Sequence, residues 1–213
     1  MLAEHVLLIV QTLVVALPLA VGLGVLSTYD ERLATVVLWG AGVLMTIPAI
    51  ALFGVLIPVL GIGNPPVIVA LVAYAQLPVV RNTYVGLTSA DGAAIDAGTG
   101  LGMTRWQRLR RVRLPVALPV VMAGIRNAVV ILVGLAAIGA FIGGGGLGDF
   151  IFYGIADGDT AMIVVTTIIL SVLALAFDYL LAVVEEGLRL RNGEAVDPTL
   201  ATRTLRGLHA KLP

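Results

Sequence analysis

The chain has 213 residues, of which 59% are apolar and only 12% are charged, and its thirteen basic residues balance thirteen acidic ones. This composition excludes a disordered chain, which needs low hydrophobicity and high net charge, and the overall charge excludes a basic nucleic-acid-binding protein. Because the chain has no cysteine, a disulfide scaffold, a zinc–thiolate site and a thiol nucleophile are excluded as well.

Long runs without charged residues predict an all-α membrane protein with about five spanning helices. A helix needs about 20 apolar residues to cross ~30 Å of hydrocarbon. The run between Arg32 and Arg81 holds 48 residues, too many for one helix, and the Gly/Asn/Pro turn at 61–66 divides it. The spans are therefore expected near residues 6–27, 35–60, 66–87, 118–142 and 161–184.

The first two spans carry features that bear on how they cross the membrane. The residues before the first run include no positive charge, and the run is long enough to span, so we expect a retained helix rather than a signal peptide. Pro48 and Pro58 in the second span leave two forms open: one kinked helix, or a helix followed by a re-entrant piece.

Basic residues are concentrated in two segments. The loop 88–117 and the tail after residue 187 each hold five of them, whereas the loops expected on the opposite side hold acids and no Lys or Arg. Positive charge marks the cytoplasmic side, so we expect a multi-pass protein of the cell (plasma or inner) membrane, with its N-terminus outside and its C-terminus in the cytoplasm. Residues 1–191 are expected to form the membrane domain and residues 192–213 a flexible cytoplasmic tail.

The large loop 88–117 is more than a linker. Residues 93–98 are expected to form a short helix that ends near two glycines, and Thr104 is expected to cap a second helix at 105–112. Pro115 then marks the entry to the next span. These features predict a protruding pair of helices, and the plain alternative is a basic loop held to anionic lipid headgroups.

This loop resembles a cytoplasmic motif of ABC-importer permeases. The motif reads Glu-Ala-Ala, three residues, Gly, nine residues, Ile, one residue, Leu-Pro. The residues that stand at its positions, with every spacing kept, are Asp96, Ala97, Gly98, Gly102, Val112, Leu114 and Pro115. Three of them depart conservatively from the motif, and the shorter carboxylate of Asp96 has less reach than a glutamate.

Other segments resemble the permeases of osmoprotectant importers, which carry glycine betaine, carnitine or choline. The segments are 47–54, 77–84, 102–107, 118–126 and 144–149. The resemblance covers roughly residues 10–190. The last of these segments is similar in methionine-type permeases too, so it leaves an amino acid such as methionine open as the cargo.

The resemblance implies a helical-bundle permease that works by alternating access. In that family two permease subunits, identical or paralogous, form the pore, two cytoplasmic ATPase subunits drive it, and an external binding protein delivers the substrate. The loop would then supply a coupling helix, near 94–105, that docks on the ATPase. The coupling residues so implied are Asp96, Ala97, Gly98, Gly102, Met103, Thr104 and Arg105. Arginines around this helix can pair with acidic groups on the ATPase or with lipid phosphates.

The run of glycines at 143–148 invites interpretation as a phosphate-binding loop. No Lys-Ser or Lys-Thr follows it, and it comes after a membrane span rather than a strand. The chain is therefore expected to bind no ATP or other cofactor itself, with ATP and Mg²⁺ held by the partner ATPase. The run is expected instead to form an external gate loop, with a flexible loop as the alternative. Its candidate residues are Gly144, Gly145, Gly146, Gly148 and Asp149.

Polar residues inside the spans are candidates for the transport pathway or for contacts between helices, because their burial in lipid is costly. They are Arg81, Asn82, Tyr84, Arg126, Asn127 and Asp178. Arg81 and Arg126 also suit anchoring at the membrane interface. Arg126 is one candidate partner for Asp178, and the sequence leaves that pairing open.

No catalytic or metal-binding pattern occurs. His5 and His209 lie at opposite ends of the chain without metal-ligand spacing, and there is no Gly-x-Ser-x-Gly motif. The chain is therefore expected to be a transport subunit rather than an enzyme, in contact with lipid and not with nucleic acid. A secondary transporter or channel without an ATPase is the alternative. The aromatic residues are few and form no evident cage for a quaternary ammonium group, so cargo recognition is expected to reside in the external partner.

Overall fold

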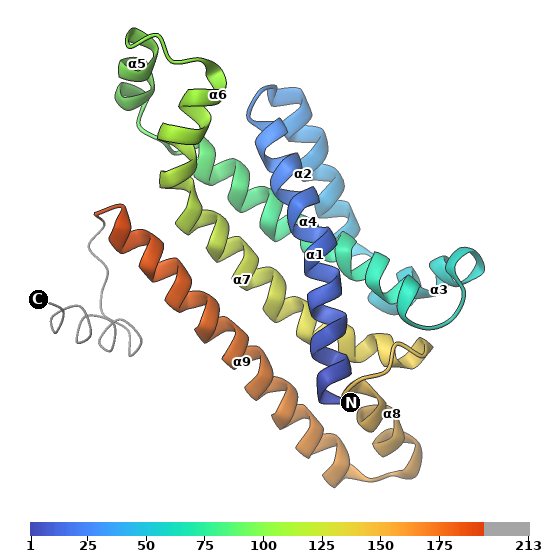
Figure 1. The fold of residues 1–213 in the computed structure, drawn as a ribbon. Helices are drawn as coiled ribbons and strands as arrows, with labels where there is room; N and C mark the ends of the chain where they lie inside the picture. The colour runs from blue at the N-terminus through green and yellow to red at the C-terminus, as the bar shows by residue number, and fades with distance from the viewer. Residues whose placement is uncertain (194–213) are drawn as a thin grey trace, which may run out of the picture.

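The computed structural model describes residues 1–193, and this part of the chain is built from helices without strands (Figure 1). The elements are α1 (Leu2–Ser27), α2 (Glu31–Thr46), α3 (Ala49–Leu60), α4 (Asn64–Thr88), α5 (Gly92–Gly100), α6 (Arg105–Arg108), the π-helical η1 (Leu109–Arg113), α7 (Leu114–Gly139), the 3₁₀ turn η2 (Ala140–Ile142), α8 (Gly148–Asp157) and α9 (Thr160–Arg191). The tail expected at 192–213 lies outside the described residues, apart from its first two.

Five crossings are present if a bent pair of helices counts as one. Four helices of the described chain are long and apolar enough to span a membrane: α1, α4, the continuous stretch from Arg105 to Ile142, and α9. The pair α2 and α3 forms the fifth, with a bend of 99° between its members. The predicted number of spans is therefore confirmed, and the second span is broken rather than kinked.

The break between α2 and α3 follows from local chemistry. Pro48 has no N–H, and it holds the preceding Ile47 in an extended conformation (φ −73°, ψ 127°), so the helix ends there. The hydroxyl of Tyr74 in α4 donates a hydrogen bond to the carbonyl oxygen of Ile47 at 2.5 Å. The break leaves the Ile47 carbonyl without a partner in its own helix, and the Tyr74 hydroxyl supplies a hydrogen bond in its place. Such a bond is needed because the membrane interior offers no water to a free backbone carbonyl.

The helix of the fourth span begins earlier than the expected span. A start near 118 was expected after Pro115, but the helix runs without interruption from Arg105 to Ile142. The π-helical segment Leu109–Arg113 precedes Pro115 directly. Its wider i→i+5 bonding replaces bonds that the proline ring would otherwise break. The basic segment and the membrane span are consequently one rod.

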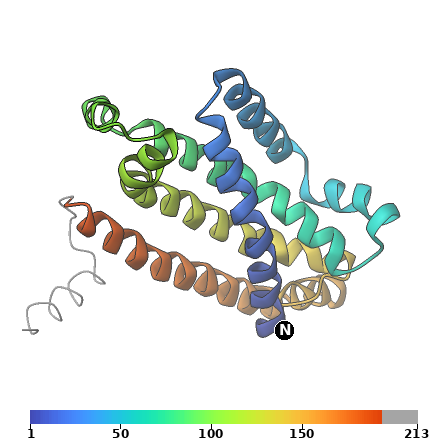
Figure 2. The ribbon, with the colours of Figure 1, turned by 45° about the horizontal axis from the view of Figure 1, so that its top comes forward.

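Helices α4 and α7 form the centre of the bundle, with α1 packed across α4 and α9 along α7 (Figures 1 and 2). Small residues bring α4 and α7 together: a Cβ atom placed on Gly124 would lie 2.6 Å from the Cβ of Asn82. Such close approach is typical of helices that associate in a membrane, where packing replaces the hydrophobic effect.

The two ends of the bundle carry different parts of the chain. The N-terminus lies beside α8 at one end, and α5 and α6 lie at the other (Figure 1). At the first end, Nε2 of the buried His5 is 3.2 Å from the carbonyl oxygen of Val133. The α1–α2 turn lies at the second end, beside the arginines of α6 and η1. This arrangement agrees with an odd number of crossings between Met1 and the basic loop.

Candidate functional site

The loop between α4 and α7 holds the predicted short helix α5, whereas the predicted second helix, α6, continues through η1 into α7. Asp91 begins α5 by accepting a hydrogen bond from the backbone N–H of Ala93 at 3.0 Å. A capping box begins α6, in which Thr104 and Gln107 each accept from the other's backbone N–H. Both helices are therefore fixed by their own caps, which makes the loop a defined knob rather than a mobile linker.

The glycines between the two helices are required by the turn. Gly102 has φ +73°, a conformation that disfavours any side chain, and no atom lies within 4 Å of the position a Cβ would take. The N–H of Met103 bonds back to the carbonyl of Gly98 at 3.0 Å, which closes the end of α5. Gly98 is buried under Met103 and Arg108. A substitution at Gly102 would thus strain the backbone while projecting outward.

The predicted coupling residues divide into two groups in the structure. Gly98 is buried and Met103 half-buried, so these two hold the knob together. The others face outward from the knob: Asp96, Ala97, Gly102, Thr104 and Arg105. The knob therefore presents a mixed surface, which also includes the exposed Leu101 and Trp106, on which a partner protein could dock.

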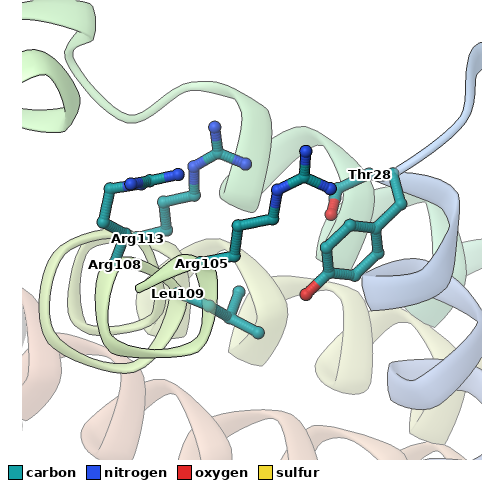
Figure 3. A pocket seen from close by; sticks show the side chains of 6 residues that line it. Thr28, Arg105, Arg108, Leu109 and Arg113 are labelled. Atoms are coloured by element: carbon teal, nitrogen blue, oxygen red, sulfur yellow. The ribbon is translucent and has the colours of Figure 1, made fainter. Parts of the chain in front are cut away.

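A basic cavity of about 240 Å³ separates the knob from the α1–α2 turn. Figure 3 shows Arg105, Arg108 and Arg113 facing the same space as Thr28. Arg108 donates to the carbonyl oxygen of Met103 at 2.8 Å, while Arg105 and Arg113 have no carboxylate partner within residues 1–193. Three guanidinium groups without a countercharge suit an anionic group such as a carboxylate or a phosphate.

An ion-pair network joins α7 to α9. Arg126 makes two hydrogen bonds of 2.9 Å to Asp178 and one of 2.7 Å to Glu185. Glu185, whose side chain is only 8% exposed, also accepts from Arg189 at 2.9 Å. The pairing that the sequence left open is therefore present. Sequence reasoning missed Glu185 and Arg189, although both follow Asp178 at helical spacing, seven and eleven residues on.

The remaining polar candidates of the spans do not join this network. Arg81 and Asn127 are exposed at the surface of this chain. The side chain of Asn82 donates to the carbonyl oxygen of Pro78 in its own helix at 2.7 Å. The half-buried Tyr84 lies on the same helix. A role for these four residues in the pathway stays a prediction.

The glycine run at 143–148 is closely packed at the opposite end of the bundle. Gly143, Gly145 and Gly146 have φ between +68° and +81°. A Cβ on Gly146 would lie 3.0 Å from Nδ1 of His5, and one on Gly148 would clash with the carbonyl oxygen of Ala137. These glycines are therefore needed for turn geometry and for close approach, so the run is an ordered loop.

Gly144 and Asp149 complete the predicted gate residues. Gly144 is buried, and a Cβ there would lie 2.8 Å from the carbonyl oxygen of Gly139. Asp149 is half-buried at the start of α8, and burial raises the pKa of its carboxyl group, with a smaller contribution from the negative charge of Glu4. Gating by this loop stays a prediction, but its position at the end remote from the basic knob fits it.

Comparison with known proteins places these features in a family. The family of binding-protein-dependent transport system inner membrane components matches residues 16–190. A carnitine transport permease protein (OpuCD) of Listeria monocytogenes is 44% identical over 186 residues, which cover 87% of this chain and 83% of the relative. An osmoprotectant import permease protein (OsmW) of Salmonella typhimurium is 44% identical over 183 residues, 84% of this chain and 85% of the relative.

Two further comparisons bear on cargo and on fold. A glycine betaine/carnitine/choline transport system permease protein (OpuCB) of Bacillus subtilis is 40% identical over 182 residues, 85% of this chain and 84% of the relative. Two inward-facing structures of the MetNI methionine ABC transporter match with TM-scores of 0.71 and 0.70, at 23% identity over 87% of this chain and 91% of theirs. At that identity the likeness concerns the fold alone.

Proposed function

The chain belongs to the family of binding-protein-dependent transport system inner membrane components, and from that premise we propose that it is the membrane-spanning subunit of an ATP-driven importer of osmoprotectants. Its cargo class is glycine betaine, carnitine or choline. The observation that carries this assignment is identity of 40–44% to permeases of those solutes along most of both chains. The chain is accordingly a transport component of a membrane, not an enzyme.

The alternatives have weaker support. A methionine cargo rests on structures that share the fold at 23% identity. A secondary transporter or channel would need no binding protein, whereas the family is described by its dependence on one. A permease for osmoprotectants agrees with the three permeases of 40–44% identity named above.

We propose that the knob of α5 and α6 docks on a cytoplasmic ATPase and transmits its movement. ATP and Mg²⁺ would bind to that partner, with two permease subunits, two ATPases and an external binding protein in the complete importer. Because α6, η1 and α7 are one rod from Arg105 to Ile142, a displacement of the knob tilts the whole span. Arg126 passes the movement on to α9 through its pairs with Asp178 and Glu185.

The same proposal sets the orientation. The knob, the α1–α2 turn and Arg189 and Arg191 of α9 would lie on the cytoplasmic side, as their charge favours. Met1, α8 and the glycine loop would then lie outside, where the binding protein docks. Accessibility of single cysteines placed at Asp157 and at Thr99 to a membrane-impermeant thiol reagent tests this, because only the first is expected to react in intact cells.

Transport by the reconstituted importer tests the cargo. The permease is purified with its cognate ATPase and binding protein and placed in vesicles loaded with ATP. We expect uptake of radiolabelled glycine betaine, carnitine or choline and none of methionine. Uptake of methionine alone, or cargo uptake that persists without the ATPase, would contradict the proposal.

Gly102→Trp tests the docking of the knob. The substitution places a large, strained side chain on the outward edge, so we expect co-purification of the ATPase to fall about tenfold or more while membrane insertion is kept. Gly158→Trp is the matched control, because Gly158 has φ +70° and an open surrounding too, but lies at the opposite end of the bundle. Equal ATPase retention by the two variants would refute the docking of the knob.

A further inference from the structure

A second cavity, of about 540 Å³, lies at the end of the bundle remote from the knob. Its walls come from η2, the glycine loop and α8, and its large side chains are Phe141, Phe152 and Tyr153, with Asp149 beside them. This volume is within the ~300–1,000 Å³ typical of small-molecule sites. The glycine loop folds Phe141 onto α8, and this is why an aromatic cluster was not evident from the sequence.

The aromatic rings form a corner whose faces are open. The ring centroids of Phe141 and Phe152 are 5.4 Å apart, and the rings are inclined at 49°. Phe141 is 60% exposed and Tyr153 57% exposed, so their faces are not covered by the described part of the chain. Exposed aromatic rings attract a cation that approaches their open faces, through the negative potential above each ring.

The charge beside the cavity is net negative, because two carboxylates, Asp149 and Glu4, share one nearby cation, the N-terminal amino group. The carboxylate of Asp149 has no hydrogen bond or ion pair within residues 1–193, and no Lys or Arg occurs between Arg126 and Arg189 in the sequence. Glu4 is the nearby acid and pairs with the N-terminal amino group at 2.9 Å, and the charge of that amino group acts on Asp149 as well, without forming an ion pair with it. A half-buried, unpaired carboxylate beside aromatic rings is costly unless a cation joins it.

We propose that Phe141, Phe152, Tyr153 and Asp149 form a weak binding site for the quaternary ammonium group of the cargo, at the outer end of the permease. The inference rests on the proposed function for the identity of the cargo. Two phenylalanine rings offer no hydrogen bond, so they favour a methylated, weakly hydrated cation over an ammonium or sodium ion. The carboxylate supplies charge attraction without the full cage that tight binding would need.

The site predicts an order among the cargoes. Choline carries a quaternary ammonium group and no carboxylate, whereas glycine betaine and carnitine each bring a carboxylate that Asp149 repels. We therefore expect the permease itself to bind choline and tetramethylammonium more tightly than glycine betaine, and methionine least. This order is set by the permease alone and is separate from the selectivity of the binding protein.

Equilibrium binding of radiolabelled choline to the permease–ATPase complex in lipid nanodiscs, without the binding protein, tests the site. We expect Asp149→Asn and Phe152→Leu each to weaken binding about fivefold to tenfold, and Phe152→Tyr to keep it. The matched controls are Asp157→Asn, an exposed acid on the same helix, and Phe150→Leu, which packs into the apolar core instead of the cavity. Unlabelled tetramethylammonium should compete and methionine should not.

The outcomes separate this inference from the function on which it rests. Unchanged choline binding in both Asp149→Asn and Phe152→Leu, or equal losses in the control variants, overturns the site even if the importer still takes up betaine. A change in dimer formation without a change in choline binding also overturns it, because the rings would then be an interface between subunits. A complex that imports none of these solutes overturns the proposed function instead.

Discussion

The two neighbours of α7 are held to it by different means. On one side, α4 packs against α7 through small residues, and half of its most apolar stretch is buried. On the other side, α9 has only 11% of the corresponding stretch buried and is joined to α7 by Arg126 and its two acidic partners. The first contact depends on close packing, whereas the second adds ion pairs to the apolar packing of Leu170 and Phe177.

This difference indicates which changes each contact can accept. Close packing leaves no room for added volume, so the α4 side should be intolerant of larger side chains. Charge pairs leave room beside them, and a cavity of about 360 Å³ lies between α7, α8 and α9. The contact of α9 with α7 should therefore tolerate larger side chains but not the removal of one member of the ion-pair network. We therefore expect α4 and α7 to keep their relative position and α9 to be able to shift against α7.

Gly124→Leu should break the first contact and give the largest effect. The new side chain would start 2.6 Å from the Cβ of Asn82 and 2.7 Å from the carbonyl oxygen of Pro78. We expect a loss of about 3 kcal/mol or more of stability, measured as the folded fraction after heating in detergent. Gly134→Leu on the same helix is the control, because no atom lies within 4 Å of its Cβ position. Similar losses of stability in Gly124→Leu and Gly134→Leu would show that close packing of α4 on α7 does not decide the effect.

Arg126→Met should break the second contact. It leaves Asp178 and the buried Glu185 without their main partner, and we expect a loss of about 2–4 kcal/mol, since Asp178 keeps some exposure. Arg81→Met serves as the control, because Arg81 is exposed. Replacing Asp178 and Glu185 by leucine in the Arg126→Met background should restore most of the stability. If it does not, shape rather than charge decides this contact as well.

The sequence predicts those features of the fold that depend on residues close together in the chain, and it does not predict those that depend on residues far apart. The spans follow from charge-free runs, and the knob follows from caps formed by Asp91 and Thr104 within a few residues. The break at Pro48 cannot be predicted from the proline alone. Four other prolines lie inside helices without breaking them: Pro18, Pro58, Pro78 and Pro119. At Pro48 the freed carbonyl finds Tyr74, 27 residues further along the chain.

The candidate sites show the same limit. The coupling residues lie in one continuous motif, so the resemblance to ABC-importer permeases could name them, and their role stays a prediction. The pair of Arg126 and Asp178 depends on the register of α7 against α9, which no local pattern fixes. The aromatic cavity depends on a turn of glycines that brings Phe141 to Phe152. Contacts between segments far apart in sequence therefore needed the structure.

Asn192→Ala should give the smallest loss of stability, and it tests the contact between α7 and α9 at the C-terminal end of α9. The side chain of Asn192 donates to the carbonyl oxygen of Pro115 in α7 at 2.8 Å, in an exposed position. We expect a loss of about 0.5–1 kcal/mol, seen as faster hydrogen exchange in the last turn of α9 with no change in α4. Protection that is lost equally in both helices would show that α9 does not move separately.

The broken second span also has a consequence for the surrounding bilayer. At 1.5 Å per residue, the 16 residues of α2 extend about 24 Å, less than the ~30 Å of the hydrocarbon core, whereas the 26 residues of α1 extend about 39 Å. Where α2 alone faces the lipid, without the α3 half of the broken span, we expect the bilayer to be thinner than beside α1 or to be replaced by a partner. The subunit carries a built-in hydrophobic mismatch on one flank, and membranes with short acyl chains should suit that flank best.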